Sequence, residues 1–122
     1  VLLRFVETMN SNIRTGDGFF RFGGEEFILL LPEHDEAEGL EVARKIHQRV
    51  SGVVEQSGWT LRYSAGVSGL RPEDTVNTWL MRTDQALYQA KHTGRNQVLC
   101  WNQDMLTTPS GLRFDEQAVT DT

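Results

Sequence analysis

The sequence predicts an α+β domain in which helices flank a mixed or antiparallel sheet. Hydrophobic spacing alternates along the chain between the helical and the strand period, in the order α-β-β-α-β-α-β. A glycine pair between two short apolar segments is typical of a hairpin among longer crossover connections. The length of 122 residues and the hydrophobic content of 39% suit one domain with its own core.

The charge balance and the cysteine content exclude several classes of protein. A net charge of −5 argues against binding to nucleic acid or to an anionic membrane, since both need a basic face, but allows a small anionic ligand held by local cations. The single Cys100 cannot form an intrachain disulfide, as expected in a reducing compartment. The longest apolar run, Phe27–Leu31, is far shorter than the ~20 residues of a membrane span. We expect a cytoplasmic domain, although a longer parent protein can be tethered to a membrane.

The first third of the chain predicts a helix and a hairpin. Apolar residues spaced by three and four indicate an amphipathic helix over residues 1–13, which the turn-forming residues 15–18 end. Strands are expected over residues 19–22 and 26–31, joined at Gly23-Gly24. Because the chain opens inside a helix and without Met, we expect it to be a fragment of a longer parent protein.

The middle of the chain predicts a covered strand, a helix and a third strand. Three consecutive leucines at residues 29–31 favour a second strand that is covered on both faces. A second helix is expected from a cap at Asp35 to Gly52 or Gly58, with acidic residues in its first turn. Alternating apolar residues over 61–67 predict the third strand.

The last third of the chain predicts a helix, a strand and a tail. A third helix is expected over residues 76–92 and a short last strand over residues 97–101. Loop-forming and polar residues dominate after that point. We therefore assign residues 1–101 to the domain and expect residues 102–122 to form an irregular tail.

A first candidate for chemistry is the run Gly23-Gly24-Glu25-Glu26-Phe27 at the predicted turn. Two glycines let a large ligand approach the backbone, because neither carries a Cβ. Two carboxylates after the turn offer oxygen ligands to a hard cation such as Mg²⁺. Taken alone, such a run is more often a hairpin turn with solvated acids.

A second candidate lies at the end of the third predicted helix, in the run DQALYQAKHTGRN over residues 84–96. Lys91 and Arg95 flank the helix end, where they could converge on phosphate oxygens. Cations at a helix C-terminus also simply complement the helix dipole. Tyr88 is expected to pack beside the core rather than to touch a ligand.

Together these segments resemble the GGDEF domain of bacterial diguanylate cyclases, here in its GGEEF form. The first run matches the family signature G-G-[D/E]-E-F, and residues 84–96 match its closing pattern D-x-A-L-Y-x-A-K-x-x-G-R-N. Between them, RYSAGVS at residues 62–68 looks like the family's T-x-S-x-G-V-A strand. The likeness covers roughly residues 1–98 in order, and three such matches are hard to attribute to chance.

The resemblance implies a fold, an activity and partners. Domains of this family resemble the palm of nucleotidyl cyclases and polymerases, a sandwich with a central, mainly antiparallel sheet and flanking helices. Two domains meet as a homodimer, each holding one GTP, and join the pair into cyclic di-GMP with release of pyrophosphate. Mg²⁺ or Mn²⁺ serves both ends of that displacement. An upstream sensor or regulatory domain in the parent protein is also implied.

The resemblance assigns the signature residues to catalysis and substrate binding. Glu25 corresponds to a metal ligand and catalytic residue that can also help to deprotonate the ribose 3′-hydroxyl. Glu26 completes the catalytic signature and supports the site. Gly23 and Gly24 would let GTP lie against the hairpin.

The resemblance also assigns residues to two phosphate-bearing ligands. Lys91 and Arg95 look like the clamp for the GTP triphosphate. Arg14 and Asp17 form an R-x-x-D at the place where the family binds its product as an inhibitor, and Lys45 corresponds to a second cation for that ligand. Without the family context, the R-x-x-D is a polar helix end followed by a turn, and Lys45 is an ordinary solvated lysine.

The chain departs from the family at its start. The family's first strand with D-x-D-x-F-K-x-x-N-D, and the following G-H-x-x-G-D, have no counterpart in it. That segment supplies an Asp metal ligand, the residues that recognise guanine and one strand of the sheet, so we expect the chain alone to be inactive. We expect the parent protein to be a product-inhibited cyclase. The alternative is a catalytically weak module that acts as a cyclic di-GMP receptor through Arg14 and Asp17.

Overall fold

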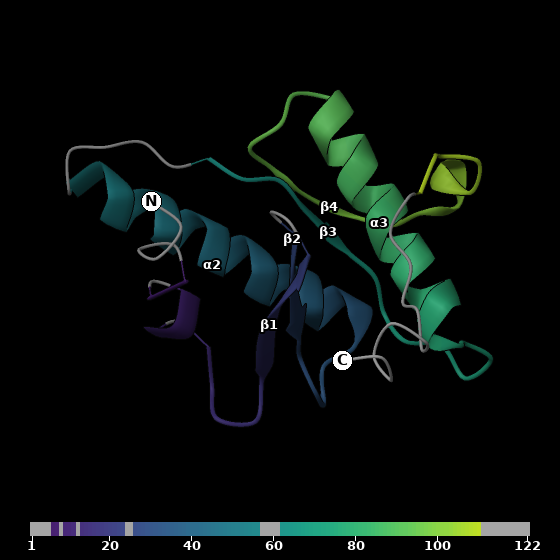
Figure 1. Ribbon diagram of the computed structural model, residues 1–122, viewed down its shortest axis with the longest axis horizontal. Helices are drawn as coiled ribbons and strands as arrows, with labels where there is room; N and C mark the ends of the chain where they lie inside the picture. The colour runs from purple at the N-terminus through teal and green to yellow at the C-terminus, as the bar shows by residue number, and fades with distance from the viewer. Residues whose placement is uncertain (1–5, 8, 12, 24–25, 57–61, 111–122) are drawn as a thin grey trace. The chain divides into compact units, whose positions relative to one another are not determined.

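The computed structural model describes residues 6–7, 9–11, 13–23, 26–56 and 62–110 (Figure 1). The chain divides into two compact units, residues 1–62 and 63–122, and each is described by itself. The described residues before Ile13, which are residues 6–7 and 9–11, are helical, in line with the predicted opening helix.

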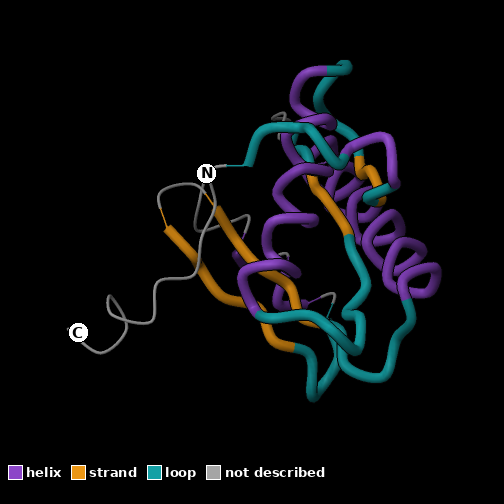
Figure 2. Tube along the Cα trace, turned by 90° about the vertical axis from the view of Figure 1, so that its right-hand side faces the viewer, coloured by secondary structure: helices purple, strands orange, loops and turns teal. Residues whose placement is uncertain are grey.

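The first unit contains the predicted hairpin. β1 (Gly18–Gly23) and β2 (Glu26–Leu30) pair antiparallel and run side by side in Figure 2. The expectation that the second strand is covered on both faces is wrong at Leu30, which is 37% exposed. Its ladder partner is Gly18, which offers no side chain to cover it.

The second predicted helix is α2 (Glu36–Gln56), which ends between the two glycines expected to stop it. Its N-terminus carries a capping box. The Glu38 N–H donates to Asp35 Oδ1 at 2.8 Å, and the Glu38 carboxylate accepts from the Asp35 N–H at 3.0 Å. Ile46 and Val50, one turn apart, are buried and form the inward face of the helix.

The second unit is built on a strand–helix–strand arrangement. β3 (Ala65–Val67) and β4 (Val98–Cys100) pair parallel, and α3 (Val76–His92) connects them and packs on both (Figure 1). The helix has the predicted bounds. Both strands are shorter than predicted, because the ladder between them is three residues long.

Gly66 allows α3 to lie directly on β3. A Cβ at this position would collide with the Thr83 carbonyl oxygen and the Leu87 backbone nitrogen of the helix. The only side chain that fits between strand and helix at this point is therefore a hydrogen atom. Ala86, on the same stretch of α3, is fully buried.

A buried ion pair fixes the start of α3. Arg82 Nη2 lies 2.6 Å from Asp74 Oδ2, and the two side chains are 7% and 3% exposed. The Arg82 hydrogen bond is the largest cause that holds the pKa of Asp74 well below its usual range, and the Arg71 N–H and the Thr78 hydroxyl act in the same direction. Because Arg82 also donates to the Gly69 carbonyl at 2.8 Å, it ties the loop after β3 to the helix.

The expectation that residues 102–122 are an irregular tail is wrong over the first part of that range. Gln103–Met105 form a 3-10 helix, η1, and Met105 is buried. The reason is Gln85 on α3, whose side-chain amide donates to the carbonyls of Leu106 and Thr108, each at 3.0 Å. Residues 111–122 lie outside the described part of the chain.

Gly66→Ala is expected to destabilise the domain by about 2 kcal/mol or more, since the helix must move away from the strand to admit a methyl group. The measurement is chemical unfolding of this domain. Gly39→Ala in α2 is the matched control, because a Cβ there meets nothing within 4 Å. The control should stabilise by about 0.5–1 kcal/mol through helix propensity, and equal effects of the two substitutions would contradict the close approach.

Candidate functional site

The signature run lies at the closed end of the hairpin. Gly23 pairs with Glu26 across the ladder, and the register shifts between Arg21 and Gly23. Such irregularities bend a strand and redirect its side chains. Gly24 and Glu25 lie outside the described residues, as does the side chain of Glu26. The structure therefore places the run at a distorted hairpin end.

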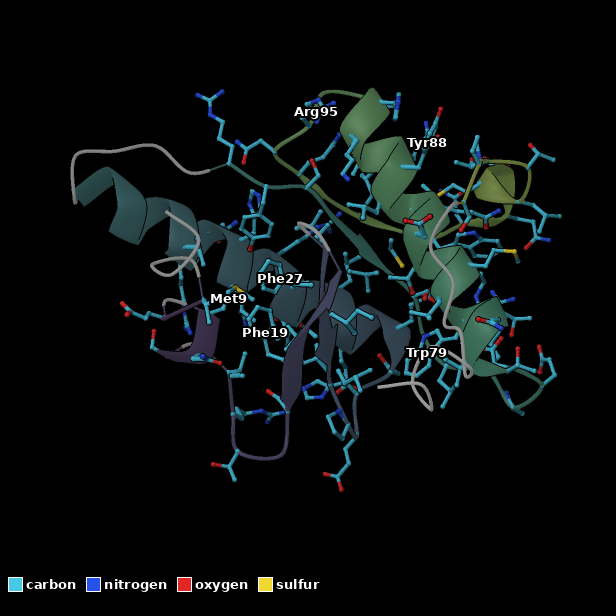
Figure 3. The ribbon with its side chains drawn as sticks, viewed as in Figure 1. Met9, Phe19, Phe27, Trp79, Tyr88 and Arg95 are labelled. Atoms are coloured by element: carbon cyan, nitrogen blue, oxygen red, sulfur yellow. The ribbon has the colours of Figure 1, made fainter. Side chains whose placement is uncertain are left out.

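An aromatic pair holds the signature to its strand partner. The Phe27 ring stacks on the Phe19 ring with 5.4 Å between centroids and 6° between planes (Figure 3). The two residues are diagonal neighbours on one face of the ladder, a spacing within reach of aromatic side chains. This contact explains why a phenylalanine suits the last position of the run.

Lys91 and Arg95 lie at the C-terminal end of α3. Lys91 is in the last turn and half-buried, and Arg95 follows the helix with an exposed side chain (Figure 3). The backbone is left-handed at Gly94, Arg95 and Asn96, with φ values of 128°, 59° and 47°. The Arg95 N–H donates to the Ala90 carbonyl at 2.9 Å. The helix end thus holds Arg95 in a conformation that non-glycine residues seldom adopt, which often marks a functional site.

Tyr88 does not pack beside the core as expected. Its side chain is 36% exposed and stacks on His92, with 3.9 Å between ring centroids. His92 Nδ1 lies 2.8 Å from the Tyr88 carbonyl oxygen, which fixes the imidazole over the phenol ring. The four-residue spacing of two aromatic side chains on a helix is the signal that could have predicted this pair.

Arg14 and Asp17 form a closed turn at the open end of the hairpin. The Arg14 N–H donates to Asp17 Oδ2 at 2.9 Å, and the Asp17 N–H donates to the Arg14 carbonyl at 3.1 Å. Gly16, between them, has a φ of 98°. The Asp17 carboxylate therefore accepts from the Arg14 backbone, and the Arg14 guanidinium extends elsewhere.

The guanidinium reaches a residue that the sequence did not single out. Nη2 of Arg14 lies 2.8 Å from Nε2 of His34, in the loop between β2 and α2. The two segments are neighbours because Gly18 faces Leu30 across the first step of the ladder. No local pattern indicates a contact between residues so far apart in the sequence.

Among the described residues, no hydrogen bond or ion pair joins Lys45 to Arg14 or Asp17. Its amino group lies 3.1 Å from Glu41 Oε1 one turn earlier in α2, and both side chains are more than half exposed, at 61% and 66%. Exposed pairs of this kind contribute little to stability, so the lysine side chain can leave its partner at small cost.

Neither a metal cluster nor a membrane span is found in the part of the chain that the structure describes. No group of three or more His, Cys, Asp or Glu side chains is suited there to hold a metal ion. Among the same residues, no helix combines the length and the apolar character needed to cross a bilayer.

The fold and its motifs are those of a known structural class. The chain is similar to the active GGEEF domain of a diguanylate cyclase from Vibrio cholerae, with a TM-score of 0.65 and 36% identity over 80% of this chain and 64% of that one. The family model described as diguanylate cyclase, GGDEF domain, matches residues 1–97. The chain belongs to the GGDEF domain family of diguanylate cyclases, and the predicted fold class is confirmed.

Curated relatives carry the same segment inside longer proteins. The chain is 38% identical to diguanylate cyclase DgcM of Escherichia coli K12 over 99 residues, which cover 81% of this chain and 24% of that protein. It is also 38% identical to the response regulator PleD of Caulobacter vibrioides over 109 residues, or 81% of this chain and 23% of PleD. The chain thus spans about a quarter of the length of these relatives.

Proposed function

We propose that the parent protein is a diguanylate cyclase that joins two GTP molecules into cyclic di-GMP. The observation that carries the proposal is the GGEEF run, which joins β1 to β2 in a chain of the GGDEF family. Two copies of the domain meet as a homodimer, each holding one GTP. A cytoplasmic location and an upstream sensor or regulatory domain belong to the same proposal, and the greater length of the relatives supports the latter.

The reaction consists of two nucleotidyl transfers. In each, a ribose 3′-oxygen bonds to the α-phosphorus of the other GTP, the bond to pyrophosphate breaks, and the 3′-hydroxyl loses its proton. In this proposal Glu25 assists that proton loss, and Glu26 supports the site. Gly23 and Gly24 carry no Cβ, so in this proposal no side chain at these positions keeps the nucleotide from the backbone.

A divalent cation fits the donors at the hairpin end. Gly23 faces Glu26 across the ladder, so both acids of the signature adjoin one turn, and carboxylate oxygens are the ligands that Mg²⁺ and Mn²⁺ prefer. Glu25 is the residue of this chain that would hold the ion. When bound, the ion stabilises charge on the attacking and leaving oxygens.

Lys91 and Arg95 bind the triphosphate in this proposal. Both cations adjoin the end of one helix, and the left-handed backbone at Arg95 fixes where its side chain starts. An ammonium and a planar guanidinium together suit the several oxygens of a triphosphate. Substrate binding is therefore their main contribution.

Arg14 and Asp17, with Lys45, bind the product cyclic di-GMP and lower the rate. The site and the signature turn lie at opposite ends of β1, whose length of six residues corresponds to roughly 17 Å. A ligand at Arg14 is thus far from the signature turn. It inhibits by binding a non-productive arrangement of the protein better than the productive one.

A second candidate function is that of a cyclic di-GMP receptor with little cyclase activity. The closed turn at Arg14 and Asp17 supports a receptor function as much as it supports product inhibition, because a ligand can bind there without any catalysis. Incubating the parent protein with GTP and Mg²⁺ and measuring cyclic di-GMP separates the two functions.

The 122-residue chain alone is expected to produce no cyclic di-GMP from GTP and Mg²⁺. It carries Glu25 but lacks the family's Asp metal ligand and the residues that read guanine. The measurement is chromatographic product analysis, with the parent protein as the positive control. Robust synthesis by the purified chain would overturn this expectation.

Glu25→Ala in the parent protein should lower kcat by about a hundredfold or more, since it removes a metal ligand and a group near the reacting hydroxyl. The fold should persist, because a carboxylate at a hairpin turn contributes little packing. Steady-state kinetics with GTP is the measurement. Lys91→Ala is the comparison and should raise KM more than it lowers kcat. Near-normal turnover of Glu25→Ala would refute the metal assignment.

Arg14→Ala should weaken cyclic di-GMP binding by about tenfold to a hundredfold, as expected for the loss of a charge-assisted bidentate contact. Calorimetric titration of the parent protein measures this, and relief of product inhibition should accompany it. Comparing Asp17→Asn with Asp17→Ala separates the role of Asp17 in the turn from its role in ligand binding. An asparagine side chain can still accept from the Arg14 N–H and keep the turn, whereas alanine cannot. If the Asp17→Asn variant kept full affinity and Arg14→Ala changed nothing, the R-x-x-D would be a structural turn only.

A further inference from the structure

His34 contacts Arg14 through the face of its ring. Nη2 of Arg14 lies 2.8 Å from Nε2 and 3.4 Å from Nδ1 of His34. A donor in line with the Nε2 lone pair would be much farther from Nδ1, which lies across the ring from that direction. The two distances therefore place the guanidinium nitrogen against the imidazole face, a contact that cations and arginine in particular make with aromatic rings.

The imidazole is itself anchored to the backbone. Nδ1 lies 2.8 Å from the carbonyl oxygen of Pro32. A carbonyl only accepts, so Nδ1 is the nitrogen that carries the hydrogen. Pro32 has a ring-restricted φ, and Glu33 is left-handed with a φ of 62°, so the carbonyl belongs to a tight turn. The ring that Arg14 touches is thus held by a rigid part of the loop before α2.

We propose that His34 is a positioning residue for Arg14 at the cyclic di-GMP site, an inference that rests on the proposed function. Arg14 is exposed, and an exposed arginine without such a contact samples many rotamers. The imidazole holds the long side chain in place before the ligand arrives. Because the ligand then does not have to order that side chain, it binds more tightly.

The face contact also leaves the guanidinium able to bind an anion. The contact with His34 is made by Nη2, so the three N–H donors on Nε and Nη1 stay available to pair with phosphate. The carboxylate of Asp17 accepts from the Arg14 backbone at 2.9 Å and does not take those donors either. His34 therefore orients the guanidinium through Nη2 and leaves the donors on Nε and Nη1 to the ligand.

The test is a double-mutant cycle on cyclic di-GMP affinity in the parent protein, measured by calorimetry. His34→Ala should weaken binding by about tenfold, whereas in the Arg14→Ala background the same change should have almost no effect, because a positioning residue acts only through its partner. His34→Phe keeps an aromatic face and should recover part of the affinity. Gln48→Ala, an exposed change on α2, is the matched control and should leave affinity unchanged.

Other results would contradict either the positioning role of His34 or the proposed product site at Arg14. Unchanged affinity in His34→Ala, or an equal loss in both backgrounds, overturns the positioning role. A loss in His34→Ala that comes with a lower unfolding temperature and is not recovered by His34→Phe also overturns it. If Arg14→Ala itself binds cyclic di-GMP normally, the proposed product site fails first, and His34 then has no ligand contact to position.

Discussion

The antiparallel ladder between β1 and β2 is the constraint on which the first unit depends. Its register sets Gly23 opposite Glu26 at one end and Gly18 opposite Leu30 at the other. A shift of one residue would move Phe27 to the other face and away from Phe19, since side chains alternate along a strand. The same register separates the signature turn from the Arg14 turn by the length of a strand. The proposed function therefore has catalysis and product binding at opposite ends of one hairpin.

The second unit depends on how α3 is fixed along its length. Gly66 lets the middle of the helix touch β3, Arg82 ties the region of its start to the preceding loop, and Gln85 anchors the segment that follows β4. Gln85 also accepts from Trp101 Nε1 at 2.8 Å, so one buried amide connects the helix to two parts of the chain. A helix restrained in this way can present Lys91 at a defined place, because the position of its last turn follows from the contacts before it.

Local sequence patterns predicted most of the helices and strands. They could not predict contacts between residues that are far apart in the sequence. α3 and the hairpin lie where periodicity and turn residues place them, and family motifs selected the candidate site residues. Residues 103–105 were predicted wrongly because Gln85, which holds the segment around them, belongs to another element. His34 was not predicted because its partner lies twenty residues earlier in the sequence. Such contacts depend on strand register, which composition does not reveal.

The charges around Arg14 are compatible with the phosphate-ligand site proposed there, although the chain as a whole is acidic. The chain carries a net charge of −5, so its overall field does not attract anions. At this turn, however, the carboxylate of Asp17 accepts from a backbone N–H, and Nδ1 of His34 donates to the carbonyl of Pro32. Among the described residues, no carboxylate forms an ion pair with the Arg14 guanidinium. The positive charge of Arg14 is therefore not paired with any described acid, and in the proposed function a phosphate of the ligand neutralises it.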